Sequence, residues 1–263
     1  MTILRWEEPE TPPVAHLIDR PVSLAVGVFD GVHRGHQGLL QRAVTDAERL
    51  GHGVPAVLTF DPNPATIVYP ESFPGILSTP EERLTLFKQF GIEEVIIVRF
   101  SPAFAVTPGP VFLQRILEIY PGLRLVVAGF NFHLGHNRDT GPRELTHQLA
   151  TRGIRVDIVP ALKDNEDSIS SSRIRRAVAT GDLEKAAALL GRQYRIFIAP
   201  GAHSNTCRPV QLLPPPGTYS CTLAGEGSSR EGMMEISDEG ILRWEPRITQ
   251  IHYVIPRSRI KCL

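Results

Sequence analysis

The sequence predicts a doubly wound α/β domain followed by a small C-terminal β-rich module, and three observations support this fold class. Short apolar runs rich in β-branched residues recur through the first 190 or so residues, as is typical of parallel strands covered on both faces. Amphipathic stretches separate these runs, and such strand–helix alternation indicates a doubly wound sheet. From about Arg195 the sequence becomes turn-rich. We therefore place a domain boundary near Tyr194, which divides the chain into residues 1–194 and 195–263.

Buried strands are predicted where a short, apolar, β-branched run occurs. They cover Leu24–Phe29, Val54–Phe60, Glu94–Val98, Arg124–Ala128 and Arg155–Val159. Helices are predicted where apolar residues recur at helical spacing, and they cover Gln37–Leu50, Pro80–Phe90, Pro108–Ile119 and Arg143–Arg152. In the second helix, Thr79 is suited to the N-cap and Pro80 to the first helical position. A sheet of this class holds its ligand at the carboxyl ends of the strands.

Two further helices, Ser171–Ala179 and Leu183–Leu190, are predicted after the sheet, with a turn at 180–182 between them. Gly191 is suited to end the second helix. Beyond the boundary, the runs 218–224, 233–237 and 249–255 suit short strands of an antiparallel sheet or a small barrel.

Charge and cysteine content narrow the classes of function. The 28 basic and 28 acidic residues give a formal net charge of zero, which argues against a protein that binds nucleic acid by bulk electrostatics. Three scattered cysteines without CxxC spacing argue against a disulfide framework or a thiolate zinc site. The N-terminus lacks the apolar core of a signal peptide, and no apolar run is long enough to span a membrane. We therefore expect a cytoplasmic protein that acts on small molecules.

The most informative segment is LAVGVFDGVHRGHQGLL at 24–40, where an apolar strand passes through a turn at Asp30-Gly31 into an amphipathic helix. A helix that begins just after a strand presents free N–H groups and a positive end to an anion. His33 and His36 are three residues apart at the start of this helix, so both can donate hydrogen bonds to a polyphosphate. The alternative is a surface histidine pair or half of a metal site.

Polar residues follow the second and fourth predicted strands. Asp61 and Asn63 alternate with prolines after the second strand, where they can hold polar groups over the edge of the sheet or form a simple turn. Asn131 follows the fourth strand, where its amide can contact a nucleotide or form an Asx-turn. His133 and His136 repeat the spacing of the first histidine pair, but no helix start follows them, so we interpret them as loop residues. A zinc site built from the four histidines is disfavoured, since no thiolate or carboxylate stands at ligand spacing.

A serine-rich helix start forms a third candidate for phosphate binding. Ser171 and Ser172 open the predicted helix, and Arg175 lies one turn beyond Ser171 on the same face. Serines at this position are commonly only N-caps. A serine-capped helix start beside an arginine is also suited to hold a triphosphate.

These segments together resemble a known family. GVFDGVHRGH at 27–36 resembles the HxGH signature of the nucleotidylyltransferases. In its longer form it resembles the FMN adenylyltransferase (FAD synthetase) module of bacterial riboflavin kinase/FMN adenylyltransferases. TFDPNP at 59–64 is similar to that family's TFDPHP, GFNFHLG at 129–135 to its GxNFxFG, and ISSSRIR at 169–175 to its ISSTRIR. The stretch from Gly181-Asp182 to Leu190-Gly191-Arg192 follows its GD…LLGR pattern. Five motifs in the right order make the resemblance specific.

The resemblance implies a Rossmann-like nucleotidylyltransferase fold and the transfer of AMP from ATP to FMN, which gives FAD and pyrophosphate. It implies Mg²⁺ as the cation that accompanies ATP. His33, His36 and Arg175 match the catalytic positions. The resemblance extends ATP binding to Gly27, Phe29, Asp30, Gly31, Asn131, Ser171 and Ser172, and flavin binding to Asp61 and Asn63.

The sequence departs from the family pattern in two places and lacks one family segment. Asn63 stands where the family usually has histidine, and Ser168 where a basic residue often precedes ISST. No segment after Gly191 is similar to the GxxLGFPTAN of the riboflavin kinase barrel, and 218–219 only faintly resembles the start of one of its strands. We therefore expect a degenerate β-module without kinase activity and a monofunctional FMN adenylyltransferase.

Three alternatives remain open. The first is a nucleotidylyltransferase that uses another phosphorylated acceptor, the second is a non-catalytic flavin- or nucleotide-binding protein, and the third is a kinase activity retained in the unusual barrel.

Overall fold

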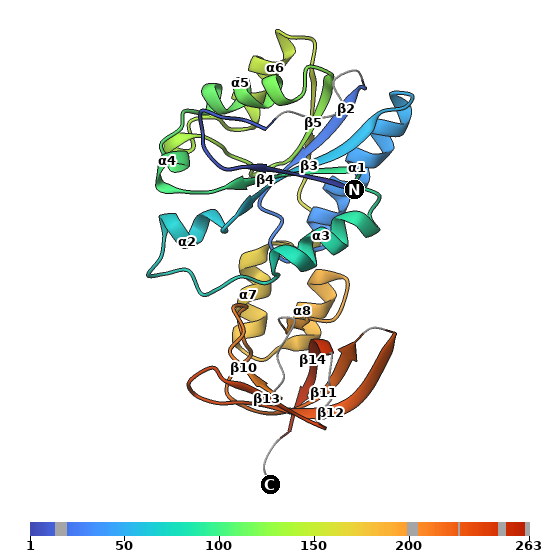
Figure 1. Cartoon of the computed structure of the whole chain (residues 1–263), viewed down its shortest axis with the longest axis vertical. Coiled ribbons are helices and arrows are strands. Elements are labelled where there is room, and N and C mark those ends of the chain that lie inside the picture. Colours follow the sequence, from blue (N-terminus) through green and yellow to red (C-terminus); the bar gives the residue numbers. More distant parts are fainter. Residues whose placement is uncertain (14–19, 199–204, 226, 247–250, 261–263) are drawn as a thin grey trace. The chain divides into compact units, whose positions relative to one another are not determined.

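The computed structural model describes residues 1–13, 20–198, 205–225, 227–246 and 251–260 (Figure 1). The chain packs as two compact units that interleave along the sequence. The first unit comprises residues 1–29, 35–73 and 84–162, and the second comprises 30–34, 74–83 and 163–263. The domain boundary predicted near Tyr194 stays a prediction, and the packing units follow different bounds.

The first unit contains a six-stranded parallel sheet, which confirms the predicted α/β class (Figure 1). In spatial order its strands are β1 (Thr2–Trp6), β4 (Glu94–Arg99), β3 (Val54–Asp61), β2 (Val22–Val26), β5 (Leu123–Gly129) and β6 (Arg155–Val159). From β2 the chain adds strands in one direction to β4 and then returns to add β5 and β6 on the other side. The order of strands therefore reverses between β2 and β5, and ligands of such sheets bind at the carboxyl ends beside this reversal.

Helices connect these strands. They are α1 (Arg34–Arg49), α2 (Pro64–Val68), α3 (Pro80–Gln89), α4 (Pro102–Ala105), α5 (Gly109–Ile119) and α6 (Pro142–Ala150), with a short 3₁₀ turn η1 (His136–Arg138) before α6. All five residues of β2 are buried, as expected for a strand covered on both faces. Among the described residues no helix is both long and apolar enough to cross a lipid bilayer.

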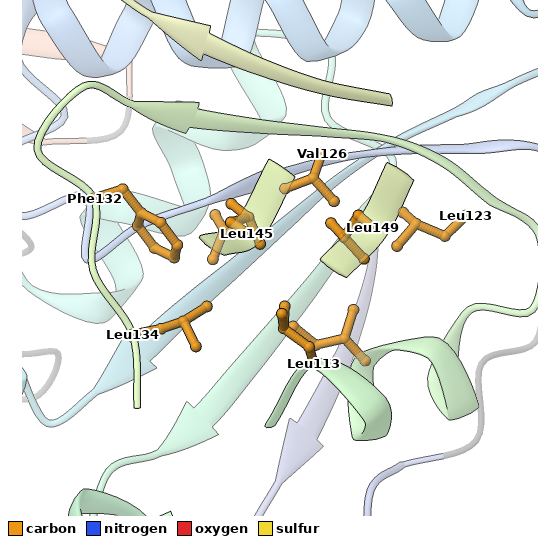
Figure 2. A pocket seen from close by; sticks show the side chains of 9 residues that line it. Leu113, Leu123, Val126, Phe132, Leu134, Leu145 and Leu149 are labelled. Atoms are coloured by element: carbon orange, nitrogen blue, oxygen red, sulfur yellow. The ribbon is translucent and has the colours of Figure 1, made fainter. Parts of the chain in front are cut away.

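Apolar side chains from β5, α5 and α6 pack on one face of the sheet (Figure 2). They surround a cavity of about 10 Å³ that is wholly apolar in its lining. That volume is at the lower limit for a single water molecule, and such voids stay dry without polar partners. We assign this cavity to imperfect packing of the core. Its lining residues are Val26, Leu113, Ile116, Leu123, Val126, Phe132, Leu134, Leu145 and Leu149.

Four sequence predictions need correction in the first unit. The strand predicted to reach Phe29 ends at Val26, and the helix predicted from Gln37 begins at Arg34, so His36 lies in its first turn. The stretch after Asp61, for which a simple turn was one expectation, becomes helix α2 at Pro64, and Asn63 is its N-cap. His136, interpreted as a loop residue, begins η1.

Strand β1 was not predicted. It pairs in parallel with β4 at the edge of the sheet, and only alternate residues of β1 are buried. A five-residue edge strand of this kind carries a weak periodic signal.

The second unit pairs two helices with an antiparallel sheet, which confirms the predicted β-rich module (Figure 1). Helices α7 (Ser171–Ala179) and α8 (Leu183–Leu190) have the predicted bounds. The sheet order is β10 (Thr206–Cys207), β13 (Leu242–Glu245), β12 (Ser228–Ile236), β11 (Gly217–Gly225), β14 (Ile251–Arg259) and β9 (Ile196–Phe197). A separate hairpin joins β7 (Lys163–Asp164) and β8 (Asp167–Ser168). Residues 249–250 of the third predicted run lie outside the described residues.

The helices and the sheet of the second unit share one apolar core. Ile174 and Val178 of α7 cluster with Tyr219 and Trp244 of the sheet, and all four are at most 2% exposed. Leu77, from the segment 74–83, belongs to the same cluster. The segment 74–83 and helix α7 therefore share a core with the antiparallel sheet.

Candidate functional site

The loop after β2 has an unusual backbone. Phe29 and Val32 have φ angles of 54° and 38°, in a region that residues with a Cβ rarely adopt, and Val32 is β-branched. Gly31 has a φ of 79°, which glycine tolerates without strain. Conformations of this kind cost roughly 1–3 kcal/mol each and persist only where surrounding contacts hold them. Loop strain of this kind is common at functional sites.

Asp30 is the centre of the contacts that hold this loop in the second unit. Its carboxylate accepts hydrogen bonds from the backbone N–H groups of Leu77 at 2.9 Å and Ser78 at 3.1 Å, and from the Ser78 hydroxyl at 3.3 Å. The Ser78 hydroxyl also accepts a bond of 2.7 Å from the N–H of Gly31. Asp30 is only 3% exposed, and its other carboxylate oxygen pairs with the guanidinium of Arg175.

Helix α7 contributes two side chains to the same residue. The hydroxyl of Ser171 donates to the backbone oxygen of Asp30 at 2.9 Å, while Arg175 bonds the Asp30 carboxylate and the Gly75 oxygen. Both side chains therefore lie on one face of α7, as their spacing predicts. The N-cap is Ser170 rather than Ser171, since the Ser170 hydroxyl accepts from the N–H of Arg173. The capping alternative for Ser171 is thus wrong, and its hydroxyl instead ties α7 to the loop.

Ser172, beside Ser171, is exposed in the first turn of α7. It takes no part in the contacts described above.

A second guanidinium, that of Arg192, contacts the loop directly. It donates to the Gly31 oxygen at 2.8 Å and pairs with Glu82 at 3.2 Å, and the Glu82 side chain is only 3% exposed. Burial raises the pKa of Glu82 and outweighs the opposing effect of Arg192. Sequence reasoning noted Arg192 only as part of the LLGR pattern and missed Glu82. The pattern was the available signal for Arg192, whereas nothing local marks Glu82 as its partner.

His33 follows this loop and is 6% exposed. Burial, aided by the nearby guanidinium groups of Arg192 and Arg175, lowers the pKa of His33 from 6.5 to about 4. The imidazole is therefore neutral at pH 7, where it donates through one nitrogen only.

We expect the stability of the fold to fall as the pH is lowered from about 6.5 to about 4. Across this interval the unfolded chain binds a proton at His33 and the folded chain does not, so the folded state loses up to about 3 kcal/mol. Urea unfolding of the wild type and of His33→Gln at pH 4.5 and 7.5 measures this contribution. The difference in unfolding free energy between the two pH values should be smaller in the variant, and equal differences would contradict the assignment.

The first unit carries the remaining predicted residues. His36 is half-buried, and its ring packs edge-on against Phe29, with a centroid distance of 5.2 Å. Gly27 is half-buried after the end of β2, and its N–H donates to the Leu58 oxygen at 3.1 Å.

The predicted flavin-side residues follow β3. Asp61 is the last residue of that strand and is half-buried. Asn63 is 8% exposed, and its side-chain oxygen accepts from the N–H of Ala65 at 3.0 Å as the N-cap of α2. Part of the hydrogen-bonding capacity of Asn63 therefore supports local structure.

Asn131, predicted to contact the nucleotide, is exposed after β5. Its backbone oxygen lies 3.0 Å from a ring nitrogen of His133, and the same nitrogen lies 3.0 Å from the guanidinium of Arg138. Arg138 was not among the predicted site residues.

The comparisons with known proteins agree with the motifs. The model of a family described as FAD synthetase matches residues 16–173, which is well over half of the chain. Bifunctional riboflavin kinase/FMN adenylyltransferases from Pseudomonas fluorescens and Bacillus subtilis are 33% and 34% identical over 172 and 174 residues. These alignments cover 65% and 66% of this chain, and the chain spans about half (54%) of each relative.

A crystal structure described as a macrolide-efflux protein from Streptococcus pneumoniae has a TM-score of 0.75 with 24% identity. The alignment covers 100% of this chain and 92% of that chain, and it shows a shared fold. The family match rests on sequence over 16–173, which includes the loop after β2, the residues after β3 and β5, and the start of α7. The chain therefore belongs to the FAD synthetase family.

Proposed function

We propose that this chain transfers AMP from ATP to FMN and releases FAD and pyrophosphate. The observation that carries the proposal is the family match over a segment containing His33 and His36 at the start of α1. The phosphate of FMN is ionised at neutral pH, so it can attack the α-phosphorus of ATP without a side-chain nucleophile. Catalysis then depends on positioning the two substrates and on stabilising charge on the departing pyrophosphate.

The histidines are suited to donate hydrogen bonds to the phosphates. A neutral His33 in a buried position offers a fixed donor that needs no reorganisation as charge develops. His36 adds a second imidazole in the first turn of α1, and the positive end of a helix dipole favours an anion.

The proposed role of Arg175 needs a change of partner or an indirect role. Its guanidinium is only 13% exposed and is paired with Asp30 in this structure. Contact between Arg175 and a phosphate would therefore compete with the bond to the Asp30 carboxylate. Ser172, by contrast, is exposed in the first turn of α7 and is suited to face a phosphate. Gly27, Phe29, Asp30, Gly31, Asn131 and Ser171 complete the proposed nucleotide site, with Asp61 and Asn63 on the flavin side.

Mg²⁺ is proposed to arrive as the complex with ATP. Among the described residues, no group of three His, Cys, Asp or Glu side chains is placed to hold a metal ion. Asp30 already accepts several hydrogen bonds and pairs with Arg175. Magnesium commonly keeps its waters and is held by substrate phosphates with one or two carboxylates.

We further propose that the chain is monofunctional, without riboflavin kinase activity. The support is the lack of a GFPTAN-like segment after Gly191 in the sequence. The antiparallel sheet would then be a degenerate counterpart of the kinase barrel.

A flavin assay tests both statements. The protein is incubated with Mg-ATP and either FMN or riboflavin, and the flavins are separated by chromatography. We expect FAD from FMN and no FMN from riboflavin. Conversion of riboflavin to FMN would refute the monofunctional proposal.

Nicotinate mononucleotide, phosphopantetheine and glycerol phosphate serve as acceptor controls in the same assay. Turnover with one of them in place of FMN would favour another nucleotidylyltransferase. Flavin binding without turnover of any acceptor would favour a non-catalytic binding protein.

A further inference from the structure

The antiparallel sheet is connected to the loop after β2 by contacts that begin at the side chain of Gln211. Gln211 is buried, with 4% of its surface exposed. Its amide nitrogen donates to the backbone oxygens of Leu77 and Arg195, both at 2.9 Å. Its amide oxygen accepts from the N–H of Phe197 in β9 at 2.7 Å. One buried amide therefore joins the start of the sheet to the segment 74–83, and every bond lies within the second unit.

The backbone beside Gln211 strengthens the same junction. Gln211 and Ile76 form an isolated parallel bridge, and the N–H of Leu212 donates to the Ile76 oxygen at 2.8 Å. The hydroxyl of Tyr194 donates to the Leu212 oxygen at 2.6 Å, which fixes that stretch from the other side.

The next contacts lead to the loop. The backbone oxygen of Leu77 accepts a hydrogen bond from the Gln211 amide, and the backbone N–H of Leu77 donates to the Asp30 carboxylate. The backbone N–H of Ser78 donates to the Asp30 carboxylate, and the Ser78 hydroxyl accepts from the backbone N–H of Gly31. The side chain of Leu77 is 1% exposed, and a Cβ at Gly31 would lie 3.1 Å from it. The loop and this segment are therefore in close contact as well as hydrogen-bonded.

We propose that Gln211 is a positioning residue, which acts through Leu77 and Ser78 on Asp30 and so fixes the loop after β2, which leads into His33. The antiparallel sheet would then be a structural support of the nucleotide site. The part of this inference that concerns catalysis rests on the proposed function. The part that concerns the loop does not, and the two can be measured separately.

Gln211→Met is the test variant, because methionine has a similar length and removes all three amide bonds. Hydrogen exchange in the full-length chain should show faster exchange at the N–H groups of Leu77, Ser78 and Gly31. If FAD is formed, kcat/KM for ATP should fall about 10- to 100-fold, the loss expected when a catalytic group is misplaced by about 1 Å. The KM for FMN should stay unchanged.

Tyr219→Phe is the matched control. Tyr219 is fully buried in the same sheet, and its hydroxyl donates to the Pro215 oxygen at 2.6 Å. That bond does not lead to the segment 74–83, so the control should leave both the exchange at Leu77 and Ser78 and the kcat/KM for ATP at wild-type values. Tyr194→Phe is a milder second variant that loosens Leu212, and it should move both readouts in the direction of Gln211→Met.

The outcomes separate the two proposals. A wild type that forms no FAD refutes the proposed function, while the exchange data still decide whether Gln211 fixes the loop. Unchanged exchange at Leu77 and Ser78 in Gln211→Met, or in Tyr194→Phe if the first variant does not fold, overturns the inference. An equal loss of kcat/KM in Tyr219→Phe would also overturn it, because general destabilisation would then explain the effect.

Discussion

Replacing His36 with alanine is expected to lower the rate of FAD formation about 100- to 1,000-fold, the usual cost of removing one fixed donor that stabilises developing negative charge. His36 lies in the first turn of α1 and is half-buried against Phe29. Alanine is the best helix former, so the variant should keep α1 intact. A single-turnover measurement of FAD formed from FMN and Mg-ATP gives the rate, and a thermal unfolding curve shows whether the variant keeps its fold.

His147→Ala provides the control for His36→Ala. His147 is exposed on α6, and its loss should leave the rate unchanged. A His36→Ala enzyme that turns over as fast as the wild type would exclude the proposed role of the imidazole.

Replacing Asp30 with alanine should destabilise the fold by about 3–5 kcal/mol, because it leaves the buried guanidinium of Arg175 without its carboxylate. The same change removes the acceptor for the N–H groups of Leu77 and Ser78. Urea unfolding of the full-length chain measures the loss of stability. The rate of FAD formation should also fall, because Asp30 lies in the loop after β2 and His33 follows that loop.

Asp30→Asn separates charge from hydrogen bonding. Asparagine retains an oxygen that can accept from Leu77 and Ser78 but lacks the negative charge, so it should cost less than alanine. Combining Asp30→Ala with Arg175→Met should recover part of the lost stability, since the unpaired cation is then gone. A double variant whose loss equals the sum of the two single losses would show that the ion pair contributes nothing to stability.

Local signals in the sequence were sufficient for some elements. Helices α7 and α8 have the predicted bounds, since Asp182 caps the start of α8 and Gly191, with a φ of 72°, ends it. The shared face of Ser171 and Arg175 follows from helical periodicity alone. These features depend on neighbours within a few residues, which a sequence displays directly.

The partners across the site were not predictable in this way. Arg175 pairs with a carboxylate 145 residues away, and Arg192 pairs with Glu82 at a separation of 110 residues. The sequence indicates that Arg175 is placed to bind an anion, but it does not say that Asp30 occupies that guanidinium. Likewise, the valine side chain at position 32 does not predict the positive φ of that residue, because this φ depends on the surrounding contacts.

The bond from Gln211 to Leu77 has a consequence for how the chain matures on the ribosome, because it closes a span of 134 residues. The strands of the parallel sheet all emerge before Leu162, so that sheet can assemble during synthesis. Arg192 and Gln211 emerge afterwards, and contacts of such long range form slowly. A nascent chain released before Gln211 would retain the bonds from Leu77, Ser78, Ser171 and Arg175 to Asp30, but the segment 74–83 would lack its bond to the Gln211 amide. The last support of the segment 74–83 would thus be added with the C-terminal strands.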